Sequence, residues 1–165
     1  MYFIGIIGIS GFILTLIVME KTKLGVPGIK AYSPGFRILD MRFRYSSNDV
    51  FAALSEIGEG GRQAYRRFLL IDFVFIFFFF TVMFFLSNIL VTGSFSLVSL
   101  ILFAGLRGLC DIAENSLILF FIDIFPNRKN KAYGICSWFT TFKFTFLIVW
   151  AVLYCFFLIL YLFGN

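Results

Sequence analysis

Histidine is absent from this sequence of 165 residues, and cysteine, proline and charged residues are scarce. Without histidine, the chain lacks the side chain that most often serves as a general base or as a zinc or haem ligand. Cys110, Cys136 and Cys155 are odd in number and widely spaced, which excludes a CxxC redox site and a disulfide framework. No glycine-rich loop carries the Lys and Ser or Thr of a phosphate-binding motif. We therefore expect no enzyme activity, no catalytic or metal-binding residues and no resident cofactor.

Charged residues are few: they make up only 14% of the sequence, whereas 61% of the residues are hydrophobic and 26 residues are Phe. Soluble domains contain about 25% charged residues. This composition leaves too little polar surface to cover a core in water, which excludes a soluble domain. A chain this apolar also gains too much from burial to stay disordered. The composition therefore indicates a membrane protein.

Four apolar stretches are long enough to cross a bilayer, which takes about 20 residues of helix. Backbone groups must be paired in lipid, and runs such as 73–80 lack the alternation of barrel strands, so each stretch is predicted to be a helix. The predicted fold is an all-α integral membrane protein with four transmembrane helices. They are placed at residues 1–19, 68–91, 95–124 and 138–163, with a tight hairpin turn at 92–94.

All but two of the 14 basic residues lie in two predicted connections, a long loop at 20–67 and a basic turn at 125–137. Basic loops stay on the side from which insertion occurs, so both termini are expected on the opposite side. We expect these side chains to contact anionic lipid headgroups or a partner, and we expect no nucleic acid, because the loop aromatics are typical of a membrane interface. The residues chosen for this contact are Arg37, Arg42, Arg44, Arg62, Arg66, Arg67, Arg128, Lys129 and Lys131.

A short amphipathic helix is predicted within the long loop at about residues 47–57. Ser46 and Asp49 have the spacing of a capping box, and the apolar residues that follow share one helical face. Gly58 is expected to end this helix, and Gly60 with Gly61 to form a turn before the next span. The helix is expected to lie on the membrane surface or against a partner.

A set of polar residues inside the predicted spans is the clearest candidate for a site, because an ionised group in the membrane centre costs about 3 kcal/mol or more. Arg107, Asp111 and Glu114 follow one another at spacings that place them on one helix face, and Asn115 continues that face. Asp72 and Lys143 match in depth. The predicted buried polar cluster is Asp72, Arg107, Asp111, Glu114, Asn115 and Lys143.

This cluster has one more acidic than basic member. The extra carboxyl is expected to be protonated or to meet a cation, a lipid headgroup or another protein. Three interpretations stay open: the cluster only holds the helices in register, it forms a proton relay or a pocket for a polar ligand, or it binds the charge of a partner chain.

Three glycines, Gly5, Gly8 and Gly11, give the first predicted helix a flat flank on which another backbone could pack closely. The flank is expected to contact either another helix of the same chain or a different subunit.

The order of several motifs resembles a family of uncharacterised small four-span bacterial membrane proteins. The residues that carry this resemblance are 38–40, Tyr45, Leu54, Gly58, 61–62, Tyr65, Asp72, Asp111, 114–115, Pro126, Thr141 and Lys143. The resemblance implies the four-helix architecture and no activity. The Phe content departs from the Leu-rich composition of that family.

The lack of a catalytic set and the glycine-lined helix favour a non-catalytic accessory subunit of a larger membrane complex, such as a respiratory-chain or ATP-synthase assembly of the mitochondrial inner membrane. Its expected partners are other membrane subunits and bound phospholipid, cardiolipin included. The alternative is a stand-alone small transporter or lipid-binding protein that uses the charged cluster. A bacterial inner membrane is the alternative location.

Overall fold

The computed structural model describes residues 1–90, 94–126 and 132–163. Every regular element in these ranges is a helix. The elements are α1 (Tyr2–Lys21), α2 (Val26–Lys30), the 3-10 helix η1 (Leu39–Met41), α3 (Ser47–Glu56), α4 (Gly58–Leu90), α5 (Ser94–Ile124) and α6 (Ala132–Phe163). Among them, α1, α4, α5 and α6 are long and apolar enough to cross a membrane. The prediction of an all-α fold with four membrane-length helices is therefore confirmed.

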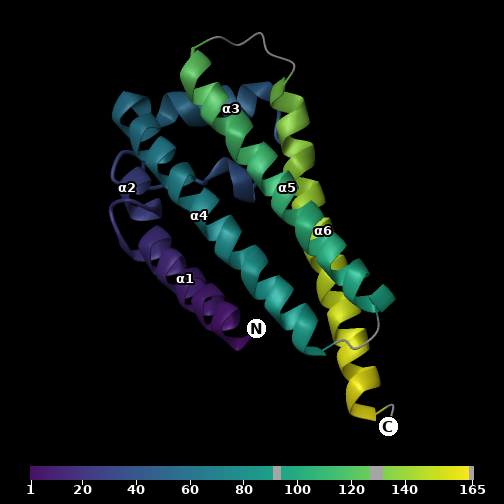
Figure 1. The fold of residues 1–165 in the computed structure, drawn as a ribbon. Helices are drawn as coiled ribbons and strands as arrows, with labels where there is room; N and C mark the ends of the chain where they lie inside the picture. The colour runs from purple at the N-terminus through teal and green to yellow at the C-terminus, as the bar shows by residue number, and fades with distance from the viewer. Residues whose placement is uncertain (91–93, 127–131, 164–165) are drawn as a thin grey trace.

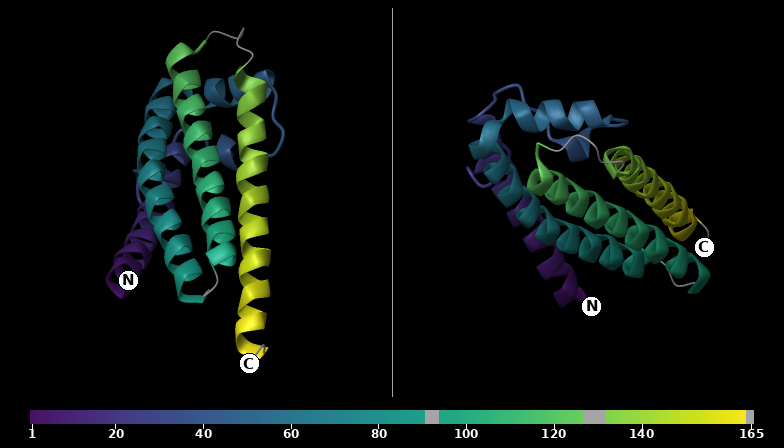
Figure 2. Two further views of the ribbon diagram at one scale, coloured as in Figure 1. Left: turned by 45° about the vertical axis from the view of Figure 1, so that its right-hand side comes forward. Right: turned by 90° about the horizontal axis from the view of Figure 1, so that it is seen from above.

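The four long helices form a row in which α1 packs on α4, α4 on α5 and α5 on α6. Figures 1 and 2 show α1 at one edge of this row and α6 at the other. The segment from α2 to α3 lies at one end of the row, and both termini lie at the opposite end (Figure 1). The side of the membrane that each end faces stays a prediction.

Helix α4 begins at Gly58 rather than at Phe68, so the expected turn at Gly60 and Gly61 is wrong. The chain changes direction before Gly60, at Gly58, which follows the C-cap residue of α3 and adopts a left-handed φ of 62°. Gly60 and Gly61 lie inside the first turns of α4, where an added Cβ would overlap Tyr32 or Ile57. The two glycines therefore serve close packing and not chain reversal.

The capping box at the start of α3 is formed. The Ser46 hydroxyl accepts a hydrogen bond from the Asp49 backbone amide at 3.3 Å, and the Asp49 carboxylate accepts one from the Ser46 amide at 2.7 Å. The Ser46 hydroxyl also donates to the Asp49 carboxylate at 2.7 Å, and this bond together with that from the Ser46 amide holds the pKa of Asp49 below its ordinary value. Val50 and Leu54 on the next turns are fully buried. The placement of α3 on the membrane surface stays a prediction.

Of the predicted connections between the last three spans, the turn at 125–137 is shorter in the structure, whereas the hairpin at 92–94 only shifts by one residue, because α4 ends at Leu90. Helix α5 begins at Ser94 and α6 begins at Ala132 rather than at Trp138, because the helical hydrogen bonding continues past the apolar stretch. The predicted contacts of Arg128, Lys129 and Lys131 lie outside the described residues, as do residues 91–93 of the hairpin.

The glycine flank of α1 faces α4 within the same chain. A Cβ added at Gly5 would overlap the Phe85 ring, and one at Gly11 would overlap the Phe78 ring. A Cβ at Gly8 would lie 2.9 Å from Thr81 Cγ2 and 3.3 Å from Thr81 Cβ. Of the two expected contacts, the structure shows the one inside the chain.

We predict that Gly8→Leu lowers the free energy of unfolding in detergent by about 1–3 kcal/mol, because the crowded Thr81 Cβ is fixed to the α4 backbone and cannot rotate away. Gly105→Leu is the matched control, since nothing lies within 4 Å of a Cβ at that transmembrane glycine. An equal loss in both variants, measured by denaturant titration, would contradict the packing of α1 on α4 described above.

Candidate functional site

Ion pairs join α5 to α6 in the interior of the helix row. Asp111 on α5 lies at their centre, with its Oδ2 2.6 Å from Arg107 Nη2 and its Oδ1 2.8 Å from Lys143 Nζ. Lys143 also lies 2.7 Å from Glu114 Oε2, and the other carboxylate oxygen of Glu114 accepts a hydrogen bond from Thr140. The spacing of four and three residues on α5 puts all three of its charged side chains on one face, as predicted from the sequence.

Asp72 on α4 joins this network through an amide. Asn115 Nδ2 donates a hydrogen bond to Asp72 Oδ2 at 2.6 Å. Each of the six residues proposed from the sequence is between 0% and 7% exposed, and together they connect three helices. Asp72 and Lys143 do line one cavity, but Asp72 bonds Asn115 and Lys143 bonds the two acids of α5.

A seventh member, Asp40, was missed by the sequence analysis, which treated it as a loop carboxylate. It lies in η1 and is only 5% exposed. Two bonds hold this segment inside the row: the Leu39 amide donates to Tyr65 Oη at 2.9 Å, and Tyr45 Oη donates to Cys136 Sγ at 3.0 Å. Two sequence signals pointed to this residue: the apolar Ile38 and Leu39 directly before it, and the place of residues 38–40 among those that carry the family resemblance.

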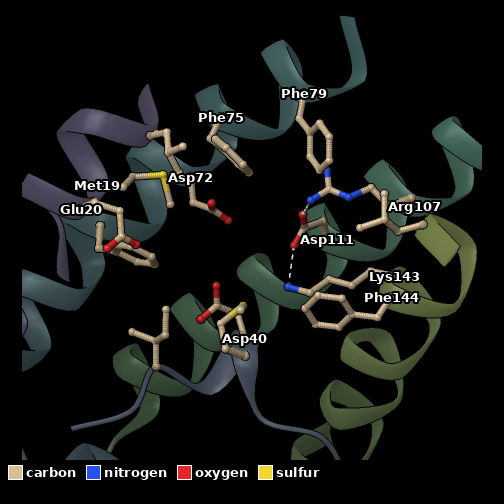
Figure 3. Close-up of a pocket in the computed structure, with 15 residues that line it drawn as sticks. Met19, Glu20, Asp40, Asp72, Phe75, Phe79, Arg107, Asp111, Lys143 and Phe144 are labelled. Carbon is tan, nitrogen blue, oxygen red and sulfur yellow. Dashed lines mark hydrogen bonds and ion pairs between the residues drawn. The ribbon is translucent and has the colours of Figure 1, made fainter. Parts of the chain in front are cut away.

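Three acids of the cluster, Asp40, Asp72 and Asp111, line a cavity of about 260 Å³. Figure 3 shows the carboxylates of Asp40 and Asp72 pointing into the same space, next to the ion pair between Asp111 and Lys143. Aromatic side chains supply much of the remaining wall; they are Phe68, Phe75, Phe79 and Phe144. The cavity therefore combines carboxylates with ring faces.

Charge around this cavity is unbalanced. Asp40, Asp72, Asp111 and Glu114 face only two buried cations, Arg107 and Lys143, and both cations pair with Asp111 or Glu114. Asp40 Oδ1 is buried without a hydrogen-bond partner among the described residues. The site thus carries two carboxyls beyond its cations, one more than the sequence analysis counted, because Asp40 is added from the loop.

Burial raises the pKa of Asp40 to about 6; the nearby Lys143 ammonium opposes this shift and Asp111 adds to it. Other titratable groups near Asp40 are Asp72 and Tyr65 on α4, Glu114 on α5, Cys136 on α6 and Glu20 on the α1 wall of the cavity. Asp40 therefore changes its charge close to neutral pH, at a position where its ionised form has no cationic partner of its own.

Donors for a metal ion are not grouped here: in the described ranges, no three Cys, Asp or Glu side chains come close enough together to hold one. Ring faces attract cations through their quadrupole, as the Arg107 guanidinium 4.3 Å from the Phe79 ring centroid illustrates. The arrangement is therefore suited to an organic cation or to protons.

The basic residues proposed for lipid or partner contact divide into two groups in the structure. Arg62 donates to the Leu54 carbonyl at 3.0 Å and lies over the Phe125 ring, and Arg66 pairs with Asp123, so both have partners within the fold. Arg37, Arg44 and Arg67 are exposed, and Arg44 lies over Trp138. Their contact with anionic lipid stays a prediction.

Arg37 and Arg42 lie beside Lys30 in a groove of about 560 Å³, which we call the basic groove; Val26, Phe36 and Phe43 complete most of its wall. The sequence analysis did not choose Lys30, because the path of the chain between α2 and η1 could not be predicted from the sequence.

We predict that Lys143→Ala destabilises the protein by about 3–5 kcal/mol, because it leaves the buried Glu114 carboxylate without a cation and Asp111 with Arg107 alone. Glu114→Gln should cost less, since the amide oxygen still accepts the hydrogen bond from Thr140. The yield of monodisperse protein and its unfolding in detergent measure both effects, with the exposed Arg67→Ala as control. Equal losses in the two cluster variants would contradict the pairing described here.

No family model, no curated protein and no solved structure matches this chain. The interpretation of the site therefore depends on its geometry alone.

Proposed function

We propose that this protein binds a small cationic ligand within the bilayer, in the cavity between α1, η1, α4, α5 and α6, as a stand-alone transporter or lipid-binding protein would. The observation that carries the proposal is Asp40. Its Oδ1 is buried, has no partner among the described residues, and belongs to a site with two more carboxyls than cations.

Burial makes this surplus costly. An ionised carboxylate removed from water loses several kcal/mol unless a cation or a set of hydrogen bonds replaces the solvent. Asp72 has one such bond, from Asn115. The remaining charge is neutralised either by protons or by a bound cation, so the two compete for the same carboxylates. The cavity has room for several non-hydrogen atoms, because a water molecule takes about 30 Å³ in the liquid.

A purely structural role does not require Asp40, whereas Asp72 joins α4 to α5 through Asn115. Asp111, Lys143 and Glu114 already hold α5 against α6 with two-sided ion pairs. Asp40 adds no bond to that network and leaves an oxygen unpaired. A residue whose burial costs free energy without stabilising the fold is more simply explained by a ligand.

A second candidate is the accessory subunit of a larger membrane complex, with the mitochondrial inner membrane as its location. The observation that favours it is α6: its C-terminal part extends beyond the ends of α4 and α5 (Figure 1), and Phe156, Tyr161 and Phe163 are exposed there. A neighbouring subunit or lipid would cover this length. Purification of a stoichiometric complex supports the subunit, whereas a homogeneous monomer that binds a cation supports the first proposal.

We predict that ethylammonium binds the purified protein at pH 7.5 and that Asp40→Asn weakens this binding about tenfold or more, because the variant removes a charge-assisted contact. Isothermal titration in detergent measures the affinity. Glu59→Gln is the control, since Glu59 is an exposed acid in the first turn of α4. An unchanged affinity in Asp40→Asn, or the same loss in the control, would contradict the site.

The affinity for ethylammonium should also depend on pH. The ionised form of Asp40 binds the cation, and its pKa lies at about 6, so affinity falls as the pH is lowered from 7.5 through 6. Titrations at several pH values measure this slope. In Asp40→Asn the slope should be largely lost, and an unaltered slope in that variant would assign the titration to another group.

A further inference from the structure

The basic groove and the acidic cavity lie next to each other, and we call the two together the depression. Glu20, Ile38 and Met41 line both of them. The groove lies on the side of α2 and the loop, and the cavity lies deeper in the row, beside the ion pairs of α5 and α6. A ligand that reaches past these three shared residues would contact both the groove and the cavity.

One short segment supplies charge of both signs to this depression. Asp40 lines the cavity and Arg42 lines the groove, with only Met41 between them in the chain. Because two residues span at most about 7 Å of extended chain, the two backbone positions lie within reach of one small molecule.

The cations of the groove are not neutralised by the fold. Arg42 Nη2 donates to the Arg37 carbonyl at 2.5 Å, and Arg42 Nε is buried without a partner among the described residues. Lys30 and Arg37 are exposed, and the described residues give neither of them an ion pair. Glu20, also exposed, is the acid on the shared wall. Guanidinium groups in this state bind phosphate oxygens through paired N–H donors.

We propose that the depression binds a phosphorylated primary amine, with the ammonium against Asp40 and Asp72 and the phosphate against Lys30, Arg37 and Arg42. The inference rests on the proposed function, because its ammonium end occupies the same cavity. It adds the anionic end of the ligand and its orientation, with the phosphate toward the loop and the amine toward the membrane interior. The group can come from a soluble metabolite or from a lipid headgroup.

A primary ammonium suits the cavity better than a quaternary one. It carries N–H donors that can reach Asp40 Oδ1, which has none from the described residues, whereas a trimethylammonium group has no donor. The ring faces of Phe75 and Phe79 accept either cation. Selectivity for the primary amine therefore depends on the unpaired carboxylate oxygen.

The test compares four probes on the full chain in detergent: ethylammonium, inorganic phosphate, O-phosphoethanolamine and phosphocholine. O-phosphoethanolamine is expected to bind about tenfold or more tightly than ethylammonium, because the phosphate adds charge-assisted hydrogen bonds. Phosphocholine and inorganic phosphate are expected to bind more weakly than O-phosphoethanolamine. An O-phosphoethanolamine affinity no higher than that of ethylammonium overturns this inference and leaves the proposed function standing.

Variants separate the two ends of the ligand. Arg37→Gln should reduce the affinity for O-phosphoethanolamine severalfold and leave ethylammonium binding unchanged, whereas Asp40→Asn should weaken both. Arg42→Lys keeps the charge of the second arginine but lacks its paired N–H donors, so it should retain only part of the affinity. Arg67→Gln, an exposed arginine outside the groove, is the control. If Arg37→Gln binds both probes as tightly as the unaltered protein does, the phosphate site is overturned. If Asp40→Asn binds ethylammonium as tightly as the unaltered protein does, the proposed function is contradicted.

A final arm identifies the source of the group. Lysophosphatidylethanolamine below its micellar concentration competes with O-phosphoethanolamine if the ligand is a lipid headgroup, and lysophosphatidylcholine does not. Absence of competition by both lysolipids assigns the site to a soluble phosphorylated amine. Both results support the shared chemistry, whereas equal competition by the two lysolipids shows non-specific uptake and overturns it.

Discussion

The ion pair of Asp111 with Lys143 is the interaction on which the interior of this protein depends. Asp111 shares its two oxygens between Arg107 and Lys143, and Lys143 in turn contacts Glu114. In a low-dielectric interior, none of these charges is tolerable alone, so each fixes the place of the next. The network brings α5 and α6 together and leaves α4 and η1 to close the cavity on its free side.

These ion pairs use both buried cations, so two further buried acids have no ion pair among the described residues. Asp72 enters the cavity from α4 and Asp40 from η1, and among the described residues neither forms an ion pair with Arg107 or Lys143, which also line it. The loop that carries Asp40 is held by specific bonds to Tyr65 and Cys136, so its position is a property of the fold. The same segment places Arg42 in the basic groove. A connection between two spans thereby lines both the cavity and the basic groove.

The helices and most of the cluster could be predicted from the sequence, because both follow from the properties of a lipid environment. A lipid environment requires long apolar helices, and it makes every buried charge conspicuous, which selected Arg107, Asp111 and Lys143 directly. Asp40 could not be found in this way, since its burial depends on a tertiary contact between η1 and Tyr65. The early start of α4 was missed for a related reason: a glycine pair resembles a turn unless the neighbours Tyr32 and Ile57 are known.

Under the proposed function, the Asp40 carboxylate forms an ion pair with the bound cationic ligand. Carbon-13 NMR of that carboxyl, assigned by comparison with Asp40→Asn, tests it most directly at pH 6, where both charge states are populated. Addition of ethylammonium should move the resonance toward the ionised form, because the cation displaces a proton. A resonance that stays in place while ethylammonium reaches saturating concentration would contradict the account.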